Sequence, residues 1–143
     1  MAVTITVYNH TKARFLSGAN AVGDEYIVNL YTVLPANLTA TTKAAAESGA
    51  TQLSTANGYT QNAKVLAGVA VTTVTTDDAK FDADNVEWTA SGGSLVANFA
   101  LVYNNTDTDD PPLFRVDFGE TITATSTTVL TIDWNPDGIF GLT

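Results

Sequence analysis

The feature that most constrains the fold is a series of short apolar and aromatic runs, each bounded by Asp, Asn, Gly or Pro. Four such runs lie in the C-terminal half of the chain, at 81–88, 97–103, 114–119 and 131–139. β-Branched and aromatic residues suit a pleated, half-buried surface, and the bounding residues favour turns. The pattern therefore predicts consecutive antiparallel strands joined by turns.

Three further strands are predicted ahead of these runs, over 3–8, 25–34 and 69–76. Apolar and polar residues alternate over 3–8, which is typical of a half-buried strand. The run 25–34 is apolar on both faces, so we expect a central strand that is covered on both sides and ends at Pro35. Between these strands 9–18 breaks the period, and its Phe-Leu-Ser-Gly end favours a short helical turn or a bend.

The segment 39–49 is the one stretch for which we predict a helix. Thr42–Ser48 is rich in Ala and other good helix formers, a Thr is available as the N-cap, and Gly49 can adopt the left-handed conformation that ends a helix. A helix this short is stable only when it packs on the rest of the protein.

Together these segments predict a mainly β protein. About seven or eight short strands at close spacing indicate an antiparallel β-sandwich, jelly-roll or immunoglobulin-like, with one short helix. We find no internal repeat and no linker, so we expect a single domain over 1–143. Large rings at the ends of patterned strands usually close a core. The predicted core residues are Trp88, Phe99, Phe118 and Trp134.

The composition argues against several classes of function. Fifteen acidic and six basic residues give a net charge of -9, and Lys and Arg do not cluster, so we expect no nucleic-acid binding. The chain has no Cys, which removes disulfides and Cys-ligated zinc. We see neither a signal peptide nor an apolar run of the ~20 residues that a membrane span needs, so we expect a soluble protein without membrane contact.

Charged residues make up 15% of the chain, against about 25% in typical domains. The surface must therefore be covered largely by Thr, Asn, Ser and Ala. Such an exterior favours a protein that contacts its neighbours over wide areas, although many secreted β proteins share it.

The chain offers little for catalysis. His10 is the single histidine, and no Gly-x-Ser-x-Gly turn presents a serine for a catalytic triad, so we interpret His10 as an exposed loop residue. Asp82 and Asp84 begin like a calcium loop, but Glu87 and Gly93 stand where that loop requires Gly and Glu. We therefore predict no enzyme activity, no metal site, no cofactor and no small-molecule substrate.

Two binding alternatives stay open. The loop Asp107–Asp110 could hold an opportunistic Ca²⁺ ion, although Asp side chains in loops more often cap turns. An aromatic platform could bind a sugar, although a core position is favoured for the two tryptophans. The rings available for such a platform are Trp88, Trp134, Tyr59 and Tyr103.

The four C-terminal runs, taken in order, resemble a group of small bacteriophage virion proteins. They read Phe-Asp-Ala-Asp-Asn-Val-Glu-Trp, Ala-Asn-Phe-Ala-Leu-Val-Tyr, Phe-Arg-Val-Asp-Phe-Gly and Thr-Ile-Asp-Trp-Asn-Pro-Asp-Gly-Ile. Members of that group typically read Phe-Asp-Ala-Asp-Asp-Val-Thr-Trp, then Ala-Val-(Ile/Val)-Tyr, Ile-Asp-Phe-Gly and Ile-Thr-Trp-(Asn/Asp)-x-x-Gly-Ile. The N-terminus departs from the group, whose members often open with a Lys-rich amphipathic helix where this chain has a strand.

The resemblance implies a structural protein of the virion, without enzyme activity and made in the bacterial host cytoplasm. The expected role is a capsid cement or decoration protein that binds the major capsid protein on the outer capsid surface, often as a homotrimer. Two alternatives remain: a glycan- or receptor-binding module of a head or tail fibre, and a neck or tail-completion protein.

Two segments are candidates for the contacts of such an assembly. The first strand carries no charge and no Pro, so at a sheet edge it would lack the usual protection against pairing. After an Asn-Pro-Asp-Gly turn, the C-terminal tail is apolar and must pack either on a neighbouring subunit or back into its own core. The candidate interface residues are Val3, Ile5, Val7, Ile139, Phe140 and Leu142.

Overall fold

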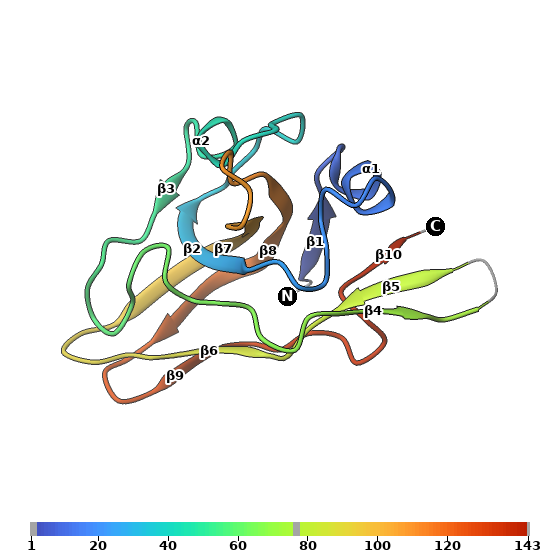
Figure 1. The fold of residues 1–143 in the computed structure, drawn as a ribbon. Helices are drawn as coiled ribbons and strands as arrows, with labels where there is room; N and C mark the ends of the chain where they lie inside the picture. Colours follow the sequence, from blue (N-terminus) through green and yellow to red (C-terminus); the bar gives the residue numbers. More distant parts are fainter. Residues whose placement is uncertain (1–2, 76–77, 143) are drawn as a thin grey trace.

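The computed structural model describes residues 3–75 and 78–142 and is mainly β, with antiparallel sheets and two short helices, as in a β-sandwich (Figure 1). The mainly β, sandwich-like fold predicted from the strand pattern is therefore confirmed. The elements in chain order are β1 (Thr4–Val7), α1 (Thr11–Leu16), β2 (Tyr26–Val33), α2 (Lys43–Ala46), β3 (Thr51–Gln52), β4 (Ala70–Thr73), β5 (Ala79–Asp82), β6 (Val86–Thr89), β7 (Leu95–Asn104), β8 (Pro112–Ala124), β9 (Val129–Ile132) and β10 (Phe140–Leu142).

One layer is a five-stranded sheet in the order β1-β8-β7-β2-β3. All of its strand pairs are antiparallel, with Ile5 opposite Val116 and Val28 opposite Val102. The first strand, β1, therefore lies at the edge of this sheet, which is the condition under which the sequence predicts an interface there.

The other layer consists of two smaller sheets, β10-β5-β4 and β6-β9. In Figure 1 the β6-β9 pair lies below the large sheet, and β4, β5 and β10 continue the layer beyond β1. The main core lies between the layers, where Phe81, Trp88 and Leu130 from the small sheets join Val102 and Phe114 from the large one.

The outer face of the large sheet is covered too. Tyr31 and Leu101 on this face form a second apolar cluster with Ala46 of α2 and Ala40 of the preceding loop. Residues 26–31 of β2 are all buried as a result. The strand predicted to be apolar on both faces is indeed covered on both sides.

The prediction of a single helix is corrected to two. α2 forms where a helix was expected, although it is shorter: the Thr42 hydroxyl accepts a hydrogen bond from the Ala45 amide at 3.2 Å, and Gly49 has φ +80°. α1 lacks a side-chain N-cap and is held by tertiary contacts instead. The buried Thr11 hydroxyl donates to the Leu113 carbonyl at 2.7 Å, and Phe15 packs on the core.

Three of the four predicted core residues, Trp88, Phe118 and Trp134, are buried in the main core. Phe99 is corrected: it is only partly buried and packs against the second cluster on the opposite face. The register of β7 against β8 shifts between Ala97 and Phe99. Such a bulge reverses the alternation of inward and outward side chains, which strict period-two reasoning does not anticipate.

Candidate functional site

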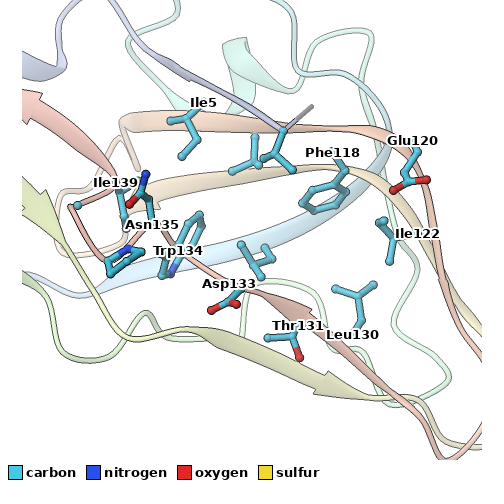
Figure 2. A pocket seen from close by; sticks show the side chains of 15 residues that line it. Ile5, Phe118, Glu120, Ile122, Leu130, Thr131, Asp133, Trp134, Asn135 and Ile139 are labelled. Atoms are coloured by element: carbon cyan, nitrogen blue, oxygen red, sulfur yellow. The ribbon is translucent and has the colours of Figure 1, made fainter. Parts of the chain in front are cut away.

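An apolar groove opens between the two layers at the β1 side of the sandwich. Its volume is about 740 Å³, and it is lined by β1, by β8, and by β9 with the turn that follows it (Figure 2). We name it the β1–β9 groove. Its apolar lining comprises Val3, Ile5, Phe118, Ile122, Leu130 and Trp134.

Two unpaired strand edges border the β1–β9 groove. Among the described residues β1 pairs with β8 alone and β9 with β6 alone. Three consecutive residues of β9, Leu130–Ile132, and the following Asp133 line the groove. Successive side chains of a strand point to opposite faces, so the groove must follow the free edge of β9.

The edge of β1 presents backbone groups for pairing. The Tyr8 amide donates to the Leu113 carbonyl of β8 at 2.9 Å. Hydrogen bonds alternate in an antiparallel ladder, so the N–H and C=O groups of Ile5 and Val7 point away from β8. β1 carries neither a charge nor a Pro, and it therefore lacks the features that usually prevent a further strand from pairing at an edge.

The rim of the β1–β9 groove is acidic. The lining includes Glu120 and Asp133, both of which are exposed, but no Lys or Arg among the described residues. The nearby Lys80 is already engaged, because its ammonium donates to the Pro136 carbonyl at 3.2 Å and lies 3.8 Å from the Asp82 carboxylate. The groove thus combines an apolar floor with uncompensated negative charge.

The structure brings three of the predicted interface residues together. Val3 and Ile5 of the first strand and Ile139 of the tail all line the β1–β9 groove. Val3 is 61% exposed, whereas Ile5 and Val7 are partly buried and pack against the main core. The first strand therefore offers its backbone edge and Val3, rather than all three apolar side chains.

The expectation of an intermolecular tail is corrected for Ile139 and Phe140. Ile139 is only 7% exposed, and its amide donates to the Phe81 carbonyl at 2.8 Å. β10 pairs with β5, with Phe140 opposite Phe81 and the partly buried Leu142 opposite Ala79. The tail folds back onto its own sandwich, which is the second of the two alternatives left open by the sequence.

Sequence reasoning missed several groove residues, notably Glu120, Ile122 and Asp133. The alternation of Leu130, Ile132 and Trp134 indicated a strand but gave no sign that one edge of it is free. Strand pairing decides which edge stays open, and pairing depends on contacts between segments far apart in sequence.

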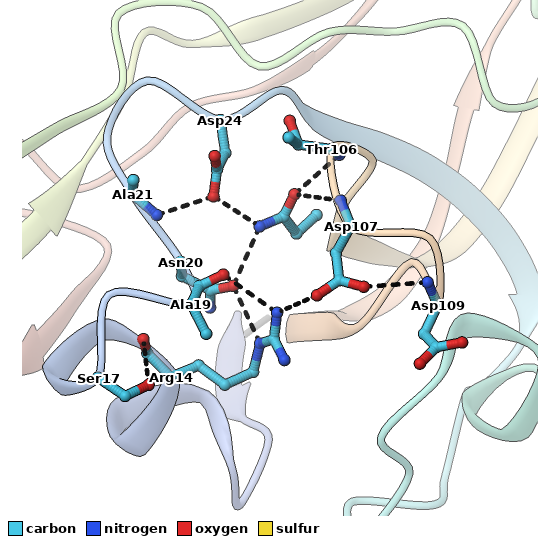
Figure 3. Close-up of polar contacts among 10 residues, drawn as sticks. Arg14, Ser17, Ala19, Asn20, Ala21, Asp24, Thr106, Asp107 and Asp109 are labelled. Carbon is cyan, nitrogen blue, oxygen red and sulfur yellow. Dashed lines mark hydrogen bonds and ion pairs between the residues drawn. The ribbon is translucent and has the colours of Figure 1, made fainter.

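Away from the groove, a polar cluster around Arg14 links three segments of the chain (Figure 3). The Arg14 guanidinium donates to Asn20 Oδ1 at 3.1 Å and to Asp107 Oδ2 at 2.7 Å. The buried Asn104 donates to Asn20 Oδ1 at 3.1 Å and to Asp24 Oδ2 at 2.8 Å. These bonds join α1, the loop before β2 and the β7–β8 turn, so the cluster has a structural role.

The Asp107–Asp110 loop belongs to this cluster. The Asp109 amide and the Arg14 guanidinium, both hydrogen-bonded to Asp107, hold the pKa of that carboxyl below its usual value. Asp107 is therefore committed to an ion pair and a turn. Within the described ranges no three His, Asp or Glu side chains are grouped as metal ligands.

His10 is half-buried at the start of α1, which corrects the expectation of an exposed loop residue. Neither ring nitrogen has a hydrogen-bond partner within the described part of the chain. Burial, and secondarily the charge of Arg14, lower the pKa of His10. The folded protein therefore favours the neutral imidazole.

The four rings considered for a sugar platform are all buried. Tyr59 and Trp88 lie together in the main core, with ring centroids 6.3 Å apart, and the Tyr59 hydroxyl accepts a hydrogen bond from the Leu30 amide at 3.1 Å. Trp134 donates from its indole nitrogen to the Asp84 carbonyl at 3.0 Å. Tyr59, Trp88 and Trp134 therefore belong to the main core, and Tyr103 is covered by Lys43, whose ammonium lies 4.9 Å from the ring centroid.

The fold and the groove together define a small β-sandwich protein with an open strand edge. Comparisons of the chain with protein-family models, with curated proteins and with solved structures find no match. None of the helices in the described ranges is long and apolar enough to cross a membrane.

Proposed function

We propose that the protein is a structural component of a bacteriophage virion, a capsid cement or decoration protein that binds and stabilises the lattice of the major capsid protein. The observation that carries this proposal is the open edge of β1 beside the β1–β9 groove, an arrangement suited to binding another chain. The resemblance of the four C-terminal runs to phage virion proteins supplies the biological context.

The charge and composition support a place on the outer capsid surface. A net charge of -9 is repelled by packaged DNA, which disfavours the inner surface. A surface rich in small polar residues can contact a neighbouring protein over a wide area without burying many charges, whose desolvation is costly.

Self-association belongs to the same proposal, with a homotrimer as the expected form. Closed symmetry is the rule for soluble oligomers, and a specific contact should bury about 800 Å² on each partner. Sedimentation of the purified protein at several concentrations measures the state. A monomer throughout would remove the trimer from the proposal.

The main rival from another class is a glycan- or receptor-binding module of a head or tail fibre. The burial of Tyr59, Trp88, Tyr103 and Trp134 speaks against a stacking platform at those rings. A neck or tail-completion protein is the second rival; it would also be structural but present in few copies.

The functional test compares phage heads that contain the protein with heads that lack it. We expect deficient heads to release DNA at a lower temperature, and purified protein to restore the wild-type temperature when it is added back. A glycan array should show no binding. Heads of unchanged stability, together with specific binding to a glycan, would overturn the proposal in favour of the receptor-binding rival.

A further inference from the structure

We infer that the β1–β9 groove is the docking site for an extended arm of the partner shell protein, which pairs with the free edge of β1 and carries apolar side chains flanked by Lys or Arg. The identity of the partner rests on the proposed function. The recognition chemistry rests on the groove alone and can be tested without a capsid.

The backbone of β1 fixes the binding mode. Ile5 and Val7 point their N–H and C=O groups away from β8, so an added strand can form a ladder with them. The four residues of β1 span ~13 Å at the usual rise of a strand. The arm therefore needs about four to six extended residues to pair along β1.

The lining of the groove fixes the side chains of the arm. Val3 is the most exposed apolar side chain there, and Ile5 and Ile122 are each partly exposed. A paired strand directs every second side chain to the same face, so alternate residues of the arm would cover Val3 and Ile5. Apolar residues at those positions are favoured because they remove apolar surface from water.

The rim fixes the charge of the arm. Glu120 and Asp133 stand at the groove with no Lys or Arg in its described lining, so a basic residue beside each would be attracted and an acidic one repelled. A second copy of this chain fits less well, because its uncharged β1 would be accompanied by its own acidic rim. A different chain with basic residues beside the strand is therefore the favoured occupant.

The test uses the whole protein and a synthetic peptide, Lys-Thr-Val-Thr-Val-Thr-Val-Lys. A matched peptide carries Glu at both ends, and a third is N-methylated at every internal residue, which blocks pairing along both of its edges. Binding is measured by titration, and amide hydrogen exchange reports the protection of Ile5 and Val7. We expect the Lys peptide to protect both amides, the N-methylated peptide not to, and the Glu peptide to bind at least about fivefold more weakly at low salt.

Charge-reversal variants test whether the acidic rim causes the preference for the Lys peptide over the Glu peptide. Glu120→Lys should reduce or reverse the preference for the Lys peptide, whereas Asp109→Lys should leave it unchanged. Asp109 is a suitable control because it is exposed in the β7–β8 turn and does not line the groove. Equal effects of the two variants would contradict a local role of the rim.

Three results would overturn the inference. The first is a lack of protection of Ile5 and Val7 by any peptide. The second is equal binding of the Lys and Glu peptides. The third is protection of both amides in the free protein that rises with its concentration, which would assign the groove to a second copy.

The inference and the proposed function can fail separately. If the protein stabilises heads but the peptides do not bind, the groove assignment is wrong and the cement role stands. If the Lys peptide binds as expected but heads are not stabilised, the groove recognises a basic strand and the cement role is wrong.

Discussion

Phe140 stacks on Phe81, with ring centroids 5.0 Å apart and ring planes 14° apart. The two residues are also directly opposite each other in the β10–β5 ladder. The last strand therefore closes the main core of its own chain. The sequence left open whether the apolar tail packs on a neighbouring subunit or on its own core, and this contact places Phe140 on its own core.

Removing the tail should destabilise the protein. Deletion of 139–143 takes away the buried Ile139 and the stacked ring of Phe140, so we expect loss of the cooperative thermal transition in circular dichroism. The milder change Phe140→Ala should cost about 3 kcal/mol, at the lower end for core Phe-to-Ala changes because the ring is partly exposed.

Leu16→Ala is the control for this prediction, because Leu16 is 89% exposed and should contribute almost nothing. A truncated chain that melts like the full-length protein would contradict the position of β10 in the structure.

The Arg14 cluster should depend on a single buried amide. Asn104 donates to Asn20 and Asp24, and its oxygen accepts from the Thr106 amide at 2.9 Å. Asn104→Ala removes all three of these hydrogen bonds and leaves a small void at a buried position, so we expect the free energy of unfolding to fall by about 2 kcal/mol.

Asn105→Ala is the matched control: it is the same substitution at an exposed neighbour that makes one side-chain bond, to Glu25. Urea denaturation of both variants measures the difference. Equal losses would mean that the cluster contributes no more than an exposed hydrogen bond does.

A tight turn at Asn57-Gly58 should not tolerate a side chain at its second residue. Both residues have positive φ, 55° and 89°, and Ala56 and Tyr59 exchange two backbone hydrogen bonds across the turn. A Cβ at Gly58 would lie 2.1 Å from the Thr89 carbonyl oxygen. Gly58→Ala should therefore lower the free energy of unfolding by at least about 2 kcal/mol, through left-handed strain and this collision.

Gly23→Ala provides the comparison, since a Cβ there meets no atom within 4 Å and the backbone does not need glycine. Chemical denaturation should find it near wild-type stability. If Gly58→Ala also proves harmless, the turn is not as close to Thr89 as the structure places it.

Stability should fall on mild acidification because of His10. Burial, and secondarily the charge of Arg14, lower the pKa of His10 in the folded state. The unfolded chain therefore binds the proton more readily, with an ordinary His pKa of about 6.5. The stability that the neutral His10 contributes is therefore fully present above the pKa of the unfolded state, and it is lost as the pH falls through the folded-state pKa.

Thermal melting between about pH 7 and pH 5 tests this. We expect the midpoint to fall in the wild type and to fall less in His10→Gln, which cannot take up the proton. The same slope in both proteins would assign the acid sensitivity to other groups.

Much of the fold could be predicted from local sequence. The alternation of Val86, Trp88, Leu130 and Ile132 was enough to predict β6 and β9, and the doubly apolar 25–34 run identified a strand covered on both faces. In each case the inward residues are apolar and regularly spaced, so one period describes both the sequence and the packing.

What could not be predicted depends on contacts between distant segments. Thr11 stabilises α1 by bonding to Leu113, about a hundred residues away in the chain. The bulge near Asn98 moves Phe99 to the other face, and it arises from the pairing of β7 with β8. Likewise, the first strand with Val3 and Ile5 and the tail with Ile139 were predicted as two separate surfaces, and only the sheet topology brings these residues into one groove.

The most direct test of the capsid role is the number of copies in each virion, measured by quantitative mass spectrometry against the major capsid protein in purified particles. A cement protein should be present in hundreds of copies, in a fixed simple ratio to the major capsid protein. About a dozen copies or fewer, the number that a ring at one vertex allows, would contradict the cement role and favour the neck or tail.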